Sequence, residues 1–117
     1  MRLKAEIWVK AYIRSCSVAG AMAVVVRHGD DDAGAIFIKV SRLDGTASLY
    51  GPAFAGFEGA ESDRRWARLV ADAPEFDVDE RLAREHRFDS DLWVVEVEDR
   101  DGRHFLGDWL TVETAAK

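Results

Sequence analysis

The chain has 117 residues, a hydrophobic content of 48% and a formal net charge of −6 at pH 7. This size and composition suit one globular domain, residues 1–117, that buries a core without help from disulfides or a metal. The negative charge makes broad electrostatic affinity for nucleic acid unlikely. The only cysteine, Cys16, has no partner for an intramolecular disulfide. The chain lacks the apolar stretch of a signal peptide and the roughly 18 consecutive apolar residues of a membrane span, so we expect a cytoplasmic protein with no membrane association.

The first segment fits two patterns. Apolar and polar residues alternate over 3–14, which is typical of a strand. A helical stripe also runs through the segment, and Gly20 is suited to end a helix; its members are Trp8, Ala11, Tyr12, Ser15 and Ala19. We favour an extended entry near Leu3 followed by a helix from about Glu6 to Ala19.

The next segments predict a sheet. Residues 21–27 are β-branched and apolar, which indicates a buried strand. A turn at 29–34 leads to a second strand at 35–41, and Asp44-Gly45 is a strong hairpin signal before a third strand at 46–50. We therefore expect a three-stranded antiparallel meander.

The middle of the chain leaves alternatives open. Residues 51–62 are a loop whose Phe54 and Phe57 either dock on the core or belong to a mobile flap over a binding surface. Residues 64–70 fit either a helix ended by Pro74 or a strand that pairs with the third strand. A helix then runs to about Arg87. Its start resembles a capping box, Asp77 to Glu80, and its outer face carries i,i+4 charge pairs: Glu80–Arg84 and Arg81–Glu85.

The C-terminal part predicts a hairpin. Residues 92–98 form a strand with Trp93 in the core, Asp101-Gly102 closes the turn, and 103–106 pair back. The tail, 107–117, packs Trp109 and Leu110 onto the body. The fold class is therefore α+β: an antiparallel sheet of about four or five strands with two helices packed on it.

Acidic and histidine residues give no metal motif. The loops that begin at Asp30 and Asp99 lack the ligand spacing of a calcium-binding loop, and Asp in tight turns usually bonds its own backbone. No zinc spacing links His28, His86 and His104, and the chain has no phosphate-binding glycine loop or nucleophile elbow. We expect no metal and no cofactor. A general base formed by His104 with Glu96 or Glu98 is one chemical hypothesis; a surface histidine in a charge cluster is the plainer interpretation.

Arg64, Arg65 and Trp66 form the best basic and aromatic cluster. They could stack a base or clamp an anion, although a core Trp flanked by solvated Arg side chains has the same pattern. Twelve of the 16 basic residues are Arg, which suits planar pairing with carboxylate or phosphate.

Three stretches carry a family resemblance: Glu6 to Val9 with Ala11 to Arg14, Arg27 to Asp30 with Asp32 to Ala35, and Arg87 to Asp89 with Asp91 to Leu106. From Arg2 to about Leu106 the chain resembles the bacterial family called domain of unknown function 1491. The family pattern often has Arg where His28 stands and Pro where Ser90 stands, which weakens a catalytic role for His28. The resemblance implies a small cytosolic bacterial protein and brings no activity or functional residues.

The function we prefer on this basis is a non-enzymatic binding or adaptor domain that recognises a protein, a second copy or a small anion. Trp and Arg are favoured at recognition surfaces, and the candidate binding residues are Arg64, Arg65, Trp66, Glu98 and His104. The alternatives are a hydrolase or transferase-type enzyme that uses His104 with Glu96 or Glu98 and, third, a weak RNA binder.

Overall fold

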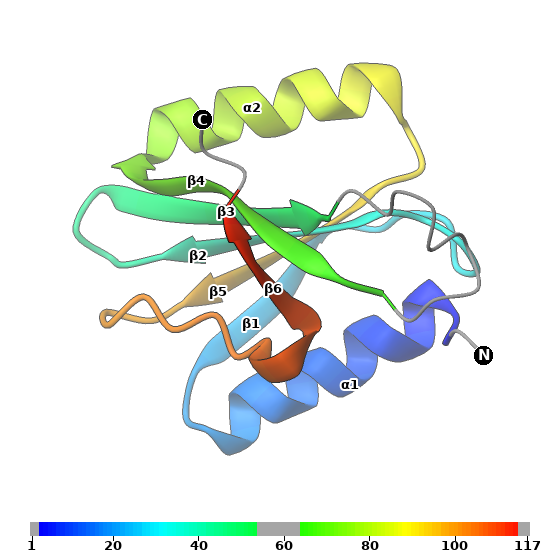
Figure 1. Ribbon diagram of the computed structural model, residues 1–117, viewed down its shortest axis with the longest axis horizontal. Coiled ribbons are helices and arrows are strands. Elements are labelled where there is room, and N and C mark those ends of the chain that lie inside the picture. The colour runs from blue at the N-terminus through cyan, green and yellow to red at the C-terminus, as the bar shows by residue number, and fades with distance from the viewer. Residues whose placement is uncertain (1–2, 54–63, 115–117) are drawn as a thin grey trace.

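Two helices lie on opposite faces of a six-stranded sheet in the computed structural model, which describes residues 3–53 and 64–114 (Figure 1). The elements in chain order are α1 (Ala5–Val18), β1 (Met22–Arg27), β2 (Ile36–Ser41), β3 (Thr46–Pro52), β4 (Trp66–Pro74), α2 (Glu75–Phe88), β5 (Trp93–Glu98), the 3-10 helix η2 (Gly107–Trp109) and β6 (Leu110–Thr114). The order across the sheet is β1-β5-β2-β3-β4-β6. The α+β class is confirmed. The sheet is mixed rather than antiparallel throughout, because β5 runs parallel to β2 and β6 runs parallel to β4.

Strand β5 lies between β1 and β2, so the predicted meander of the first three strands is wrong. β1 pairs antiparallel with β5, and β2 pairs parallel with its other edge. The loop that joins β1 to β2 therefore crosses the start of β5. There Asp30 N donates to Asp91 O at 2.9 Å, and Trp93 N donates to Ala35 O at 2.7 Å. Gly29 approaches Asp91 so closely that an added Cβ would collide with its backbone.

The predicted C-terminal hairpin is also wrong beyond its turn. Residues 103–106 form no strand, because both edges of β5 are already used by β1 and β2. The turn itself forms: Gly102 N donates to Asp99 O at 2.9 Å, and Arg103 Nη2 pairs with Asp99 Oδ1 at 2.7 Å. The chain then leaves the sheet and passes toward α1.

Helix α2 begins at Glu75, two residues before the predicted cap at Asp77, and no side chain caps its start. Pro74 precedes the first turn, where a residue without an N–H costs nothing. The N–H of Glu75 donates to Gly45 O at 3.0 Å, so the β2–β3 turn supplies an acceptor for the helix start. The expected pair between Arg81 and Glu85 forms at 2.9 Å.

The ambiguous segment at 64–70 belongs to a strand: β4 pairs antiparallel with β3. The segment after Leu106, expected only to dock on the body, also contributes β6 at the edge of the sheet. Phe54 and Phe57 lie outside the described residues. The core has two parts, one under each helix. The part under α1 includes Trp8, Tyr12, Ile38, Trp66 and Trp93. The part under α2 includes Phe37, Leu49, Val78, Leu92 and Val94.

Trp93 lies in the core as expected, with 2% of its surface exposed, and its Nε1 donates to Asp30 O at 2.8 Å. The side chain therefore ties the crossing loop to β5 as well as filling the core. We expect Trp93→Ala to lower the free energy of unfolding by about 3–5 kcal/mol, the usual range for a buried large aromatic. Urea unfolding measures this, and a loss below about 1 kcal/mol would contradict the packing role.

Gly102 has a φ of +74°, in the left-handed region that side chains rarely adopt. A Cβ there would meet the mobile end of Arg42, with Nη1 at 2.5 Å, so backbone strain rather than crowding decides the cost. We expect Gly102→Val to cost about 1 kcal/mol or more, and Gly102→Asn to cost less because Asn visits this region more readily. Equal melting temperatures for the two variants would refute this account.

Candidate binding surface

The predicted cluster of Arg64, Arg65 and Trp66 does not form one exposed surface. Trp66 is a core residue: its ring stacks on Trp8 at 4.2 Å between centroids, and its Nε1 donates to Ile36 O at 2.9 Å. The buried Arg64 guanidinium lies 3.4 Å from each of three main-chain carbonyls, those of Leu3, Asp32 and Gly34. Trp66 therefore has no free face on which to stack a base, and Arg64 joins the start of α1 to the acidic loop.

His104 and the glutamates predicted to pair with it lie on opposite faces of the sheet. The His104 ring packs beside Tyr50 at 5.3 Å, and its main-chain oxygen accepts from the Tyr12 hydroxyl at 2.6 Å, both under α1. Glu96 and Glu98 point to the α2 face, because they alternate with the α1-facing residues of β5. The structure therefore does not bring together a base made of His104 and either glutamate.

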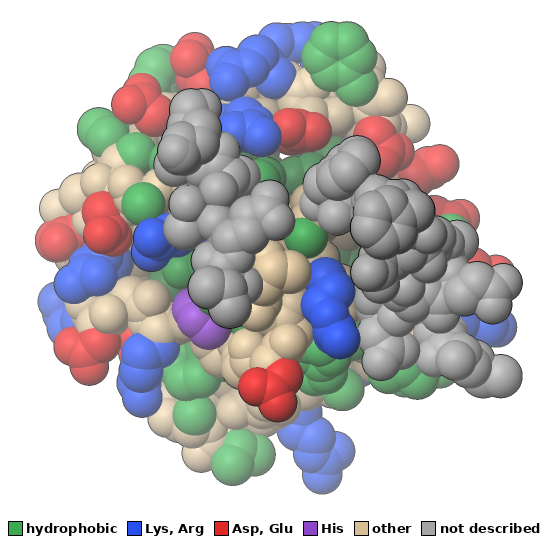
Figure 2. All heavy atoms as spheres, viewed as in Figure 1, with side chains coloured by type: hydrophobic (Ala, Val, Ile, Leu, Met, Phe, Trp, Pro, Cys, Tyr) green, Lys and Arg blue, Asp and Glu red, His purple; other side chains and the backbone are tan. Residues whose placement is uncertain are grey.

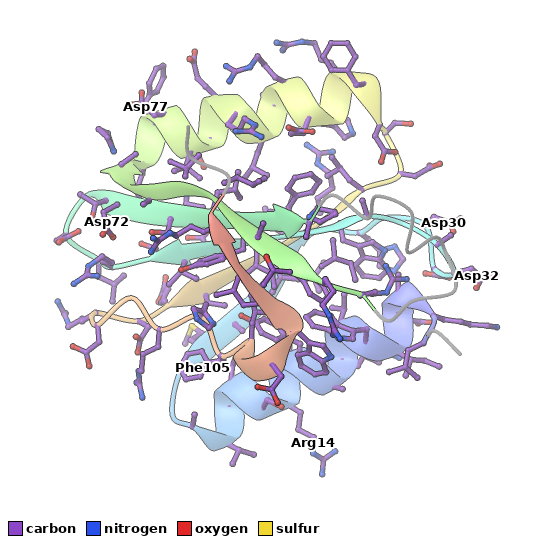
Figure 3. All side chains as sticks on the ribbon, viewed as in Figure 1. Arg14, Asp30, Asp32, Asp72, Asp77 and Phe105 are labelled. Atoms are coloured by element: carbon purple, nitrogen blue, oxygen red, sulfur yellow. The ribbon has the colours of Figure 1, made fainter. Side chains whose placement is uncertain are left out.

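The side chains of the acidic loop at 28–34 pair within the loop, except that Asp32 Oδ1 lies 3.8 Å from Lys4 Nζ. Asp30 Oδ2 accepts from the backbone N–H of Asp32 and of Ala33, and His28 Nε2 lies 3.3 Å from Asp31 Oδ1. Asp30 and Asp32 lie at one end of the molecule, far from Asp72 at the other (Figure 3). Within residues 3–53 and 64–114, no three His, Cys, Asp or Glu side chains are placed to hold a metal ion.

Lys39 lies at the centre of an acidic cluster that sequence reasoning did not single out. Its side chain is only 6% exposed on the α2 face, and its Nζ is 2.9 Å from Glu75 Oε1, 2.9 Å from Asp79 Oδ1 and 3.9 Å from Glu96 Oε1. One cation thus faces three carboxylates, which we call the Lys39 cluster. Its charge is negative overall.

The pKa values in this cluster move in different directions. Burial opposes the charge of Lys39, but hydrogen bonds to Asp79 and Glu75 and the charge of Glu96 outweigh it and raise its pKa. The hydrogen bond from Lys39 lowers the pKa of Glu75. Burial raises the pKa of Glu96. The charge of Lys39 lowers it, and the neighbouring carboxylates raise it. A further cation close to Glu96 would therefore stabilise its ionised form.

Strand β1 is an exposed edge, which corrects the prediction of a buried strand. In the described part of the chain it pairs with β5 alone, so its other edge offers backbone donors and acceptors. Met22 is 64% exposed, Val24 50% and Val26 58%. Arg27 is the only charged residue of the strand. Edge strands are usually protected against added strands by charge, a proline, a β-bulge or a cover. The register with β5 shifts between Val25 and Arg27, so Met22 to Val25 form the regular part of this edge.

Register places this apolar strip directly beside the carboxylates. Met22 lies opposite Glu98, and Val24 lies opposite Glu96, so all four share the α2 face. Helix α2 packs mainly over β3 and β4. It reaches the C-terminal end of β1, where His86 Nε2 lies 3.2 Å from Arg27 Nη1, whereas Met22 and Val24 stay exposed. We call Met22, Val24, Val26, Glu96 and Glu98 the β1 surface. On the α1 side of the same strand, an open depression of about 420 Å³ is lined by Ile13, Ser17, Gly20, Ala21, Met22 and Ala23.

No local sequence feature distinguishes this edge from a buried strand. The apolar run at 21–26 would suit the centre of a sheet equally well. Its exposure follows from where β5 inserts, which is a long-range property. The Lys39 cluster is hidden for the same reason, because its members come from β2, α2 and β5.

None of the helices in the described residues is long and apolar enough to cross a membrane. On the face shown in Figure 2, acidic and basic side chains are interspersed. Together, the fold and its surfaces define a small α+β domain with an exposed apolar edge strand. The chain belongs to a known protein family: residues 3–107 match the model described as "Protein of unknown function (DUF1491)".

Solved structures agree with this assignment. A crystal structure of a DUF1491 family protein from Caulobacter crescentus is 44% identical, covers 95% of this chain and 99% of that chain, and has a TM-score of 0.78. A solution structure of a protein from A. tumefaciens is also 44% identical, with coverage of 84% and 86% and a TM-score of 0.76. The family resemblance seen in the sequence is therefore confirmed. No curated protein matches this chain.

The raised pKa of Glu96 leads to a prediction about stability. A carboxyl group whose pKa is higher in the folded state destabilises that state once it is ionised, and the cost disappears as pH falls below the ordinary glutamate pKa. We expect Glu96→Gln to raise the melting temperature at neutral pH, and we expect this advantage to vanish in acid.

Thermal melts across this pH range test the idea, with the exposed Glu98→Gln on the same strand as the control that should change less. A lower melting temperature for Glu96→Gln at neutral pH would show that Lys39 needs all three carboxylates.

Proposed function

We propose that the protein is a non-enzymatic, cytoplasmic binding domain that takes an extended segment of a partner protein as an added strand on β1. The observation that carries this proposal is the exposure of Met22, Val24 and Val26 on a strand whose outer edge pairs with no described residue. Backbone hydrogen bonds would give the affinity, and side chains on alternate positions would give the specificity.

Charge favours a basic partner. Long cationic side chains on the α2 face of an added strand could reach across β1 toward Glu96 and Glu98. Their approach would stabilise the ionised form of Glu96. At present the pKa of Glu96 is raised by burial and by the neighbouring carboxylates. Side chains on the other face of the added strand would meet the depression beside Ile13 and Ala23. The preferred segment therefore alternates basic and apolar residues.

A second copy of the chain fits less well. Antiparallel pairing of two β1 strands would bring apolar residues together, but it would also place two acidic clusters on the same face of one joined sheet. Like charges across an interface oppose association, and each copy carries a net charge of −6. A foreign basic segment has no such cost.

Binding of a short synthetic peptide of alternating valine and lysine tests the proposal. We expect it to perturb the backbone amide NMR signals of residues 22–27 and to bind much more tightly than a matched peptide of valine and glutamate. N-methylation of alternate peptide amides should abolish binding if it removes the strand hydrogen bonds.

The matched variants are Val24→Lys, which puts a charge on the edge strand, and Val18→Lys, which makes the same change at a more exposed valine at the end of α1. Only Val24→Lys should abolish binding, and both should keep the wild-type melting temperature. Equal binding of the acidic peptide or of the N-methylated peptide would refute strand addition. A doubled mass in sedimentation with shifted β1 signals would instead assign the edge to a second copy.

A further inference from the structure

Three polar side chains from distant parts of the sequence converge on the other face of the sheet. Tyr50 on β3 lies directly opposite Arg68 on β4 in the strand register, so both side chains project to the α1 face. The ring of His104, from the loop after β5, lies 5.3 Å from the ring of Tyr50. A guanidinium, a phenol and an imidazole thus share one location that the β1 surface does not include.

The imidazole is held in one orientation by its own loop. His104 Nδ1 accepts a hydrogen bond from Leu106 N at 2.9 Å, so the neutral ring carries its proton on Nε2. The Tyr12 hydroxyl donates to the main-chain oxygen of His104 at 2.6 Å. The next residue, Phe105, packs against the α1 core with a φ of +58° (Figure 3). These contacts hold the half-buried ring beside Tyr50, with its proton on Nε2, before any ligand binds.

The charges around the imidazole also suit an anion. Burial lowers the pKa of His104, and the positive charge of Arg68 lowers it further. Burial raises the pKa of Tyr50 and Asp72 adds to this, whereas the charge and hydrogen bond of Arg68 oppose it. Asp72 is engaged by Arg42, with Oδ1 3.7 Å from Nη1, and by the Ser48 side chain.

We propose that Arg68, Tyr50 and His104 form a binding site for the phosphate group of a small molecule. Arg68 can contact two oxygens through its planar fork. His104 Nε2–H and the Tyr50 hydroxyl supply donors from other directions. Donors from several directions match a tetrahedral oxyanion with three terminal oxygens better than a planar carboxylate with two. This proposal does not depend on the β1 surface.

Inorganic phosphate is the probe, and the ring signals of the histidines are the readout. We titrate phosphate in the millimolar range at constant ionic strength and follow the three histidines by NMR. His104 should shift and saturate, and its pKa should rise by about one pH unit, because a bound anion stabilises the imidazolium. His28 and His86 are internal controls and should not saturate in parallel. The His28 side chain is 60% exposed, and His86 lies on α2 with its Nε2 3.2 Å from Arg27 Nη1.

Variants separate the site from general charge effects. Arg68→Gln should weaken phosphate binding about tenfold or more, since it removes the charged donor. Arg65→Gln removes an exposed Arg close by in sequence and should leave binding unchanged. Tyr50→Phe should weaken binding less than Arg68→Gln. Arg68 is exposed, so its variant should keep the wild-type melting temperature.

Several outcomes would overturn the proposal. One is no saturable His104 shift with phosphate, and another is an equal loss of binding in Arg65→Gln and Arg68→Gln. Parallel shifts of all three histidines would show a general salt effect instead of a site. Saturation by acetate as tight as by phosphate would reject the tetrahedral ligand and assign the site to carboxylates.

Discussion

The insertion of β5 between β1 and β2 is the constraint on which the rest of the structure depends. β1 and β2 are joined by a loop but not paired, and β5 fills the space between them by pairing with both. This requires the loop to cross the start of β5, where Gly29 has no room for a side chain and Trp93 bonds the Asp30 carbonyl. It also leaves β1 at the edge of the sheet and sends the chain after Gly102 away from the sheet toward α1.

The local features of the chain were predictable because they depend on nearby residues. The α1 helix, the β2–β3 hairpin at Asp44-Gly45 and the positive φ of Gly102 follow from periodicity and turn chemistry. The burial of Trp93 followed from alternation along β5. In each case the pattern that supports the prediction spans only a few residues.

The pairing partners were not predictable for the opposite reason. A meander of the first three strands and a hairpin after β5 both satisfy the local turn signals, yet β5 can have only two neighbours. Once β1 and β2 take both edges, residues 103–106 cannot pair, and His104 moves to the face opposite Glu96 and Glu98. The candidate sites could not be predicted without the pairing. The charge of Arg68 acts on His104, and Val24 lies opposite Glu96, only in the folded sheet.

The residues of β5 that face α2 explain why one end of the sheet stays uncovered. Leu92 and Val94 are buried under α2, whereas the next two residues on that face, Glu96 and Glu98, are acidic. A helix packed dry over those carboxylates would have to desolvate them. Lys39 lies at this boundary and neutralises part of the charge where burial is greatest. The sequence therefore pairs an exposed apolar strand with acidic neighbours that a packed helix could not cover, and a ligand that carries cations meets no such penalty there.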